Sequence, residues 1–449
     1  MGDSLYPSVY HRAFAPPWVD ALLLREGIMP PRGAAFEHER TFTLIDLGCG
    51  DGLGLMLNAA ACPESRFIGI DAMGGHIERA RSMASELGLS NVEFRCATFS
   101  EALRDEPAGA DYVSVQGVLS WISPSNRHDL LVLVARNLKA GGAAAMGYNC
   151  LPGWSPFLSF QRLVWTLSRA KPGSPSERFA RALDDARELS GAGMTAFGKA
   201  QLEQIDDLRE RLPQEYFPHE YLNAHWQPLW SADVIDDAAS HGLRFARSGM
   251  AQRLREDFIL KAAQREALTK IEASAARELA ADMFLNCSFR IDLYVKAPAR
   301  RLGDEKARSA RLAGCWMATA LQDEIAYSAS TPAGTIRFDN AAARAIMNRL
   351  DQGPATFGDI AAAHPGMTPA DVLNAGDALF VAGRIAPAGR RDDEIAVGEV
   401  NRWIVDTDGG GAKINALLTP HGPVAAPQAD LHAILNDSAA RRRLGLGTK

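Results

Sequence analysis

The sequence lacks the features that place a protein in or across a membrane. No run of it approaches the roughly 18 consecutive apolar residues that a membrane-spanning helix needs. Residues 1–6 contain no basic segment followed by an apolar one, so they do not resemble an export signal. Tyr6 stands where an acylation signal requires Ser or Thr. These absences predict a cytoplasmic protein with no membrane partner.

Cysteine and excess charge are also scarce. The six cysteines among 449 residues are scattered, with no Cys-x-x-Cys pair and no histidine at ligand spacing, which predicts reduced thiols and no metal site. The formal net charge is −6, so the chain has no overall attraction to phosphate backbones. We therefore expect no nucleic-acid partner.

The composition is that of an ordinary folded protein, with 47% apolar and 23% charged residues. At about 150 residues per domain, the length predicts two or three domains. Short apolar runs typical of strands alternate with helical stretches from residue 43 onward. The expected strands are 43–47, 66–70, 92–96, 112–115 and 143–148, and the main helices between them are 54–62, a stretch ending at 87, and 130–138. This alternation predicts an α/β fold with a parallel sheet covered on both faces.

The alternation stops after Pro152-Gly153. Residues 155–212 are mostly helical by periodicity and belong to an expected insertion at 155–226. Two further strands are expected at 243–246 and 289–296, with a strongly helical stretch at 252–281 between them. We interpret the two strands as the sixth and seventh of one Rossmann-like sheet. Because ligands bind at the carboxyl ends of strands in open α/β sheets, the helical insertion would lie there as a lid or substrate pocket.

The last third of the chain outlines a winged helix. Residues 299–310 read as a linker, and three helices at 341–350, 356–363 and 368–383 precede a short strand-like run. The candidate recognition helix, 368–383, carries Asp371 and Asp377 but no Lys or Arg, whereas binding to DNA needs cations. We therefore expect this domain to contact protein, for example in a homodimer. The predicted domains are a cofactor-binding core (1–154), the insertion (155–226), a segment completing the sheet (227–298) and a winged-helix-like domain (311–449).

A glycine-rich turn follows the first expected strand. Gly48, Gly50 and Gly52 have no Cβ atoms, so the backbone can approach a ligand closely. Asp46 stands two positions before the first glycine. Its carboxylate suits the ammonium group of S-adenosylmethionine and would repel the pyrophosphate of a dinucleotide. The turn therefore predicts S-adenosylmethionine as the cofactor.

Residues after the second and third strands fit the same cofactor. Asp71 ends the second strand, about 20 residues beyond the last glycine, which is the separation typical of a carboxylate that accepts both ribose hydroxyls. Ala72 follows it and is expected to contact the cofactor. After the third strand, Thr98 could bond the adenine edge and Phe99 could pack on its face. Gln116, after the fourth strand, is also expected to contact the cofactor.

Each of these residues also has a structural interpretation. Gly52 could pack a helix on a strand, Asp71 could be a turn residue and Phe99 could belong to the core. Their joint order on successive elements favours the cofactor site. A nicotinamide dehydrogenase is the alternative enzyme, but Asp46 and the absence of a third glycine at dinucleotide spacing count against it.

Several segments resemble the class I methyltransferases that carry a methyltransferase regulatory domain. They are residues 52–60, Gly-Val-Leu-Ser-Trp-Ile-Ser at 117–123, Tyr-Asn-Cys-Leu-Pro-Gly-Trp at 148–154, and, for the regulatory segment, 219–223 and 289–293. The resemblance covers residues 5–300 well and the tail more loosely. It implies a seven-stranded sheet, S-adenosylmethionine as cofactor, and kinship with bacterial protein-lysine methyltransferases that have a winged-helix tail. Gln116 departs from the His usual in the family.

Three functions follow from this resemblance and stay open. The leading one is methyl transfer to a protein or peptide side chain, with lysine favoured. The others are a small-molecule methyltransferase and a cofactor-binding scaffold without catalysis. Tyr148 could accept a hydrogen bond from an amine acceptor, and Asn149 could orient the amine. Trp121, His219 and Tyr221 are expected at the acceptor pocket, where Glu220 is a further polar neighbour; packing or capping roles are the alternatives for all of them.

Overall fold

The computed structural model describes residues 10–33, 41–319, 326–389, 400–401, 403–404, 416–419, 422–425, 437–438 and 440. The amino-terminal segment judged above for an export signal lies outside them. Each of the six cysteines lies within them and is a free thiol. Within these residues, no helix combines the length and the apolar character that crossing a bilayer requires.

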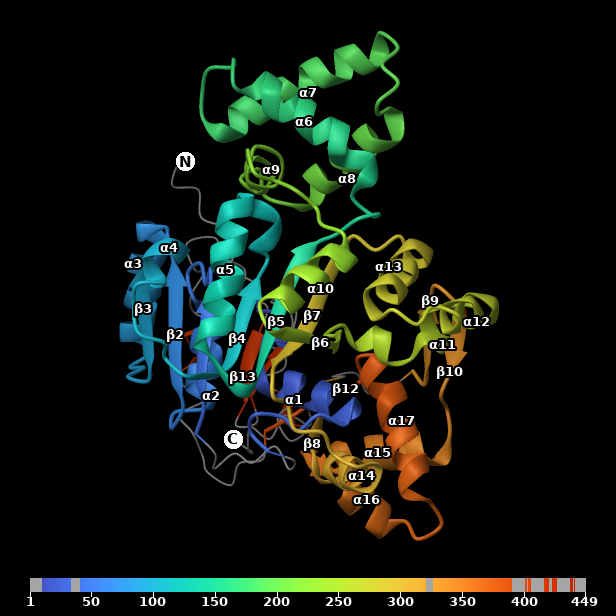
Figure 1. Ribbon diagram of the computed structural model, residues 1–449. Coiled ribbons are helices and arrows are strands. Elements are labelled where there is room, and N and C mark those ends of the chain that lie inside the picture. The colour runs from blue at the N-terminus through green and yellow to red at the C-terminus, as the bar shows by residue number, and fades with distance from the viewer. Residues whose placement is uncertain are drawn as a thin grey trace.

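A seven-stranded sheet in the order β3-β2-β1-β4-β5-β7-β6 forms the centre of the molecule (Figure 1). The first five strands are parallel, and β7 lies antiparallel between β5 and β6. The prediction of one sheet that includes both late strands is confirmed. The strands are β1 (Thr43–Leu47), β2 (Arg66–Asp71), β3 (Val92–Cys96), β4 (Ala110–Gln116), β5 (Leu138–Asn149), β6 (Leu243–Ser248) and β7 (Phe289–Lys296).

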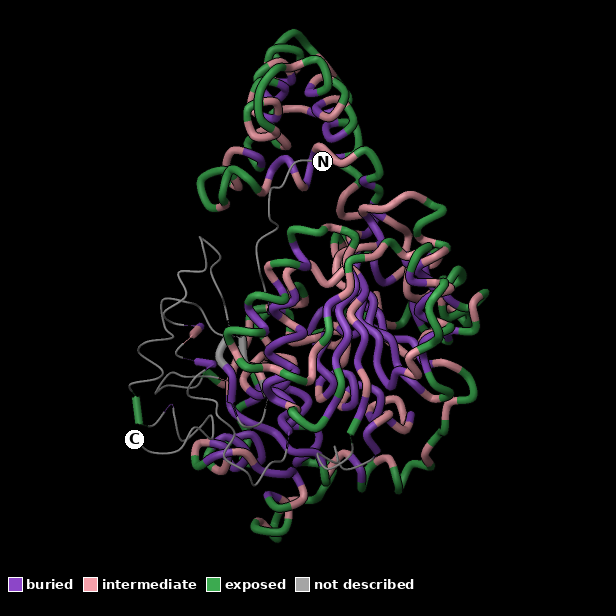
Figure 2. Tube along the Cα trace, turned by 90° about the vertical axis from the view of Figure 1, so that its left-hand side faces the viewer, coloured by how far each residue is buried: buried purple, intermediate pink, exposed green. Residues whose placement is uncertain are grey.

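Helices cover both faces of this sheet because its strands are apolar on both sides. Leu44 and Ile45, adjacent on β1, enter two different hydrophobic clusters. The cluster of Leu44 includes residues of α1, α2 and α3, and that of Ile45 includes residues of α4, α5 and α10. Figure 2 shows the buried strands running through the middle of the body. The helices are α1 (Pro16–Arg25), α2 (Leu53–Ala61), α3 (Gly74–Glu86), α4 (Phe99–Ala102), α5 (Pro124–Asn137) and α10 (Ser231–Ser240), with 3-10 turns η1 (Arg12–Phe14) and η2 (Leu119–Trp121).

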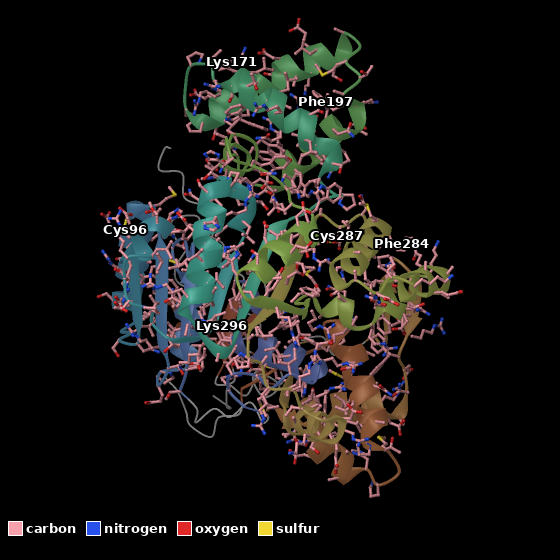
Figure 3. The ribbon with its side chains drawn as sticks, in the orientation of Figure 1. Cys96, Lys171, Phe197, Phe284, Cys287 and Lys296 are labelled. Carbon is pink, nitrogen blue, oxygen red and sulfur yellow. The ribbon has the colours of Figure 1, made fainter. Side chains whose placement is uncertain are left out.

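A helical insertion follows β5 and stands apart from the sheet at the top of Figure 1. It has an apolar core of its own, which includes Phe160, Phe179, Leu183 and Phe217. Lys171 and Phe197 mark it in Figure 3, distant from Lys296 at the other end of the sheet. Its elements are η3 (Ser155–Phe157), α6 (Leu158–Ser168), α7 (Pro175–Gly191), α8 (Lys199–Arg211) and α9 (Tyr216–Tyr221). The helical character is as expected, and the role as a lid stays a prediction.

Residues 252–281 are mostly helical, as expected. The stretch is divided into short pieces, η4 (Ala251–Leu254), α11 (Glu256–Ile259), α12 (Ala262–Thr269) and α13 (Ser274–Leu285). Phe258, Ile259 and Leu260 are all buried. A continuous helix would turn one of three successive side chains away from the core, whereas Leu260 is extended and ends α11.

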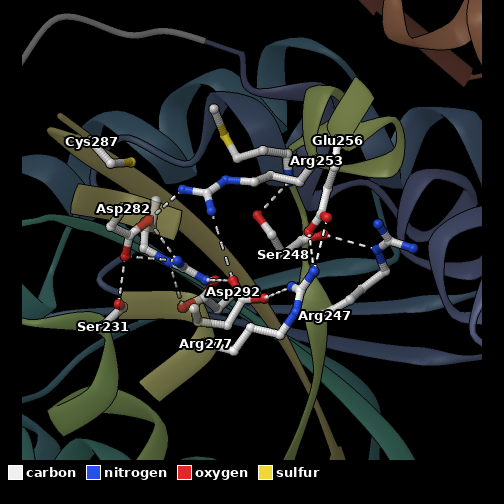
Figure 4. A network of polar contacts seen from close by, with 12 residues as sticks. Ser231, Arg247, Ser248, Arg253, Glu256, Arg277, Asp282, Cys287 and Asp292 are labelled. Carbon is white, nitrogen blue, oxygen red and sulfur yellow. Dashed lines mark hydrogen bonds and ion pairs between the residues drawn. The ribbon is translucent and has the colours of Figure 1, made fainter. Parts of the chain in front are cut away.

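A buried ion-pair network joins β7 to α13 (Figure 4). The guanidinium of Arg290, which is 1% exposed, lies 2.8 Å from Asp282, 2.8 Å from Glu278 and 2.7 Å from Asp292. Arg253 of η4 also pairs with Asp282. Because these acids and bases are buried together, each depends on the others for compensation of its charge. The network fixes β7 against α13.

The segment expected as a linker, 299–310, is mostly helical, since α14 (Asp304–Ala313) occupies most of it. Asp304 and Glu305 lie in its first turn and Arg311 in its last, which suits the helix dipole, and Ala310 packs on Leu24. Its Arg- and Lys-rich composition is that of a surface helix.

The described carboxyl-terminal part contains three small sheets beside three helices. The winged-helix assignment and the domain boundaries stay predictions. Asp371 and Asp377 of the candidate recognition helix have structural partners there, Asp371 in an N-terminal cap with Thr368 and Asp377 in ion pairs with Arg311 and Arg25. The elements are β8 (Cys315–Ala318), β9 (Ser328–Thr331), β10 (Gly334–Arg337), α15 (Ala341–Leu350), β11 (Ala355–Thr356), α16 (Phe357–Ala363), α17 (Pro369–Val381), β12 (Ile385–Pro387), β13 (Ala416–Thr419) and β14 (Gly422–Ala425).

Candidate cofactor and acceptor site

The glycine turn between β1 and α2 has a backbone that other residues would strain. Gly48, Gly50 and Gly52 have φ of 76°, 56° and 73°. A Cβ atom on Gly48 would lie 2.4 Å from Val118, and one on Gly52 would lie 2.3 Å from the ring of Phe94. Two of the glycines are thus required by packing as well as by φ. A Cβ atom on Gly50 would meet nothing within 4 Å, so the middle of the turn presents open backbone.

Asp71, at the end of β2, holds this turn. Its Oδ2 accepts a hydrogen bond from the Gly50 N–H at 3.0 Å, and its Oδ1 accepts one from the Met73 N–H at 2.8 Å. His76 Nδ1 lies 3.7 Å from Oδ1. Burial acts to raise the pKa of Asp71, but His76 and the two backbone donors outweigh it and lower that pKa. The carboxylate therefore stays charged, with lone pairs left for further donors.

Asp46 provides the second carboxyl of the site. Ser114 Oγ, from the neighbouring strand β4, donates to its Oδ1 at 2.7 Å. Burial, with a contribution from the charge of Asp71, raises the pKa of Asp46 to about 6. Burial and the same two carboxylates also raise the pKa of the Cys49 thiol. The turn is thus a site of negative potential, in which a bound cation would be stabilised.

The residues expected at adenine lie at the ends of β2 and β3. Ala72 is exposed and Phe99 is half-buried at the start of α4. Thr98 is the N-terminal cap of α4, and its hydroxyl donates to Glu101 at 2.7 Å and accepts from the Glu101 N–H at 3.3 Å. Because its proton is already donated, Thr98 can offer adenine only an acceptor. Gln116 is half-buried at the end of β4.

Tyr148, expected as an acceptor contact, has a structural partner within the sheet, and its acceptor role stays a prediction. Its ring is fully buried, and its hydroxyl donates to Asp292 of β7 at 2.6 Å. This side chain belongs to the ion-pair network of β7 and stabilises the sheet. The substrate contact expected of Tyr221 also stays a prediction. Its ring is buried in the core of the insertion, against Phe160, Phe179 and Phe217.

Asn149, one residue further along β5, belongs to a cluster of polar side chains beside the insertion. Its backbone N–H donates to Ser120 Oγ at 2.9 Å, and its side-chain Nδ2 donates to Glu220 Oε1 at 3.4 Å. The Tyr216 hydroxyl donates to the other oxygen of Glu220 at 3.2 Å. Burial raises the pKa of Glu220 to about 7. From the sequence, Glu220 was expected only as a polar neighbour of the site. The feature that could have identified it is a carboxylate among the apolar and aromatic residues of a short helix.

Two more residues that were expected to contact the acceptor lie close to this polar cluster. The Trp121 carbonyl, in η2, accepts a hydrogen bond from Asn223 Nδ2 at 3.2 Å. His219 is half-buried on α9, one residue before Glu220. The structure therefore brings Asn149, Glu220 and Trp121 together through residues of η2, β5 and α9, whereas Tyr148 and Tyr221 face packed cores.

Comparison with known proteins adds to this geometry. Residues 44–142 match the methyltransferase domain family, and residues 213–296 match a predicted methyltransferase regulatory domain. The uncharacterised protein sll1526 of Synechocystis is 26% identical over 324 residues, which cover 72% of this chain and 64% of that protein. The uncharacterised protein RP789 of Rickettsia prowazekii is 24% identical over 205 residues, 45% of this chain and 36% of that protein. The chain thus spans less than two thirds of either relative.

Among solved structures, PKMT2 of Rickettsia typhi in complex with AdoHcy superposes with a TM-score of 0.71 at 18% identity, over 96% of this chain and 88% of that one. At this identity the likeness shows a shared fold, and it extends beyond the sheet to nearly the whole chain. The two family matches, on one seven-stranded sheet, make this chain similar to S-adenosylmethionine-dependent methyltransferases that carry a methyltransferase regulatory domain.

Proposed function

We propose that the protein transfers the methyl group of S-adenosylmethionine to the side-chain amine of a lysine in a protein or peptide. The observation that carries the proposal is the pairing of Asp46 and Asp71 around the open backbone of Gly50. In this proposal the methionine ammonium lies near Asp46 and the ribose hydroxyls near Asp71. The adenine then lies by Ala72, Thr98 and Phe99, and Gln116 faces the cofactor from β4.

The acceptor side supports an amine. Methyl transfer is an in-line displacement at a carbon already activated by the sulfonium charge, so the protein mainly aligns the nucleophile, which can supply about 7–11 kcal/mol. An amine must also be neutral to attack. The polar cluster of Asn149 and Glu220 combines burial with hydrogen-bonding groups, which suits the amine of a lysine side chain. PKMT2, whose name denotes a protein lysine methyltransferase, shares the fold over nearly the whole chain.

Methyl-labelled cofactor tests the choice of acceptor. Purified protein incubated with labelled S-adenosylmethionine and lysate is expected to place the label on protein, where acid hydrolysis recovers it as methyl-lysine. An Asp71→Ala variant serves as the blank. Label found only in the solvent-extractable fraction would instead indicate a small-molecule acceptor. Label in neither fraction, with cofactor binding intact by calorimetry, would indicate a scaffold without catalysis.

Cofactor affinity is expected to depend on pH through Asp46. In the free protein this carboxyl has a pKa of about 6, and a bound ammonium favours its charged form. Affinity should therefore fall as pH drops from 7 to 5, by up to about tenfold per unit below 6. Calorimetry across this range checks the slope, and Asp46→Asn should bind weakly with a flat profile. A flat profile in the unmodified protein would place the ammonium away from Asp46.

A further inference from the structure

Glu220 is a buried carboxyl without a compensating cation. It is 4% exposed, and none of the ion pairs found in the described part of the chain includes it. Asp282 and Asp292, equally buried, both pair with Arg290. A buried acid that lacks such a partner destabilises the fold when it ionises. Its hydrogen-bond donors Asn149 and Tyr216 are neutral groups, so they carry no charge that would offset the carboxylate.

Aromatic side chains surround Glu220. The indole of Trp226 is 8% exposed, and it faces Glu220 closely enough to act against the rise in the pKa of that carboxyl. Trp226 packs edge-to-face on Trp154, with ring centroids 5.4 Å apart. Tyr216 borders the carboxyl from the same helix. Aromatic faces beside a carboxylate are the surroundings that bind ammonium groups in proteins.

Backbone hydrogen bonds place the segment that follows Glu220 at the carboxyl ends of the strands, where the candidate cofactor site lies. The Leu229 N–H donates to the Asn149 carbonyl at 3.0 Å, and the Gln227 N–H donates to the Ser120 carbonyl at 2.8 Å. The segment that follows α9 therefore runs along the carboxyl end of β5. In this fold the reactive methyl group faces the same edge of the sheet. Glu220 lies within residues 213–296, the part matched by the regulatory domain.

We propose that Glu220, carried by the regulatory segment, is the general base that deprotonates the acceptor lysine, with Asn149 positioning the amine. This rests on the proposed function. The lysine ammonium gives one proton to the Glu220 carboxylate and becomes a neutral amine. The nitrogen lone pair then forms the new bond to the methyl carbon, while the carbon–sulfur bond pair stays on sulfur and neutralises it. Glu220 finally releases its proton to solvent.

The titratable groups that act on Glu220 support this role. Tyr216 donates to it, and burial followed by the charge of Glu220 raises the pKa of Tyr221. His219 is its chain neighbour on α9. Burial has raised the pKa of Glu220 itself to about 7, so the carboxyl can both accept and release a proton near neutral pH.

Glu220→Gln tests the inference because it keeps the shape of the side chain and removes the base. We expect kcat for protein methylation to fall about 10²–10⁴-fold. The affinity for S-adenosylmethionine should change less than about twofold. The log of kcat/KM for the unmodified protein should rise with pH to a break near 7, and this break should vanish in the variant. Glu215→Gln, an exposed carboxylate just before α9, is the matched control and should change none of these values.

The outcomes separate the two proposals. If the unmodified protein methylates lysine and Glu220→Gln keeps its rate and pH break, Glu220 is not the base and the proposed function stands. If the unmodified protein labels no protein, the proposed function falls, and this inference falls with it. Folding of the variant is checked by its thermal midpoint. Above pH 7 this midpoint should exceed that of the unmodified protein, because the unmodified protein then holds an ionised carboxylate in its interior and the variant holds a neutral amide. Tyr216→Phe is a second variant and should shift the pH break upward.

Discussion

Asp71→Ala is expected to weaken binding of S-adenosylmethionine by about 10²–10⁴-fold. The substitution removes a charged acceptor for two ribose hydroxyls, and hydrogen bonds to charged groups contribute about 1.5–3 kcal/mol each. It also removes the contact that fixes the Gly50 N–H. Isothermal calorimetry measures the affinity directly, so the result does not depend on knowing the acceptor.

The matched control for this prediction is Glu93→Ala. Glu93 is an exposed carboxylate on the adjacent strand β3, and its ion pairs with Arg66 and Arg95 lie on the surface. It should leave cofactor affinity unchanged, which excludes a general effect of lost negative charge. A loss of less than about threefold in Asp71→Ala would show that the ribose binds elsewhere.

Arg290→Met is expected to reduce the free energy of unfolding by about 3–5 kcal/mol. The guanidinium is buried among Asp282, Asp292 and Glu278, so its loss leaves uncompensated carboxylates in the interior. Methionine fills much of the same volume, which limits the contribution of a cavity. Denaturant unfolding followed by circular dichroism gives the change, read at pH 7, where these carboxylates would have to be protonated or expelled.

Arg277→Met separates this effect from the loss of any ion pair. Arg277 pairs with Glu256 in the same region, but both side chains are 31% exposed. Its substitution should cost less than about 1 kcal/mol because water screens the pair. Equal losses in the two variants would contradict the assignment of the network as a buried unit.

The cofactor side of the site could be predicted from sequence because it depends on local order. The glycine turn, Asp46 and Asp71 follow successive strands, and parallel strands bring their ends to one edge. The sheet was predictable for the same reason, since each strand of the core is an apolar run bounded by turns. The helix within 299–310 was not predicted, because a surface helix and a linker have the same polar composition.

The acceptor side could not be predicted because it depends on distant pairings. Tyr148 and Asn149 are adjacent, yet alternation along β5 sends their side chains to opposite faces. The buried hydrogen-bond partner of the Tyr148 hydroxyl is Asp292, which lies on β7 and is 144 residues away. The position of Glu220 likewise depends on how the insertion folds back on β5, and no local pattern encodes that return.

The two ends of the insertion meet side by side. Leu229 accepts a hydrogen bond from the Leu151 N–H and donates one to the Asn149 carbonyl, so the chain leaves and re-enters the core at one place. A helical unit joined in this way can be exchanged for another without shifting a strand. Under the proposed function, capture of the methyl donor and choice of the molecule to be modified would then lie on separate parts of the chain. An exchange of the unit between relatives should transfer target preference while donor affinity stays constant.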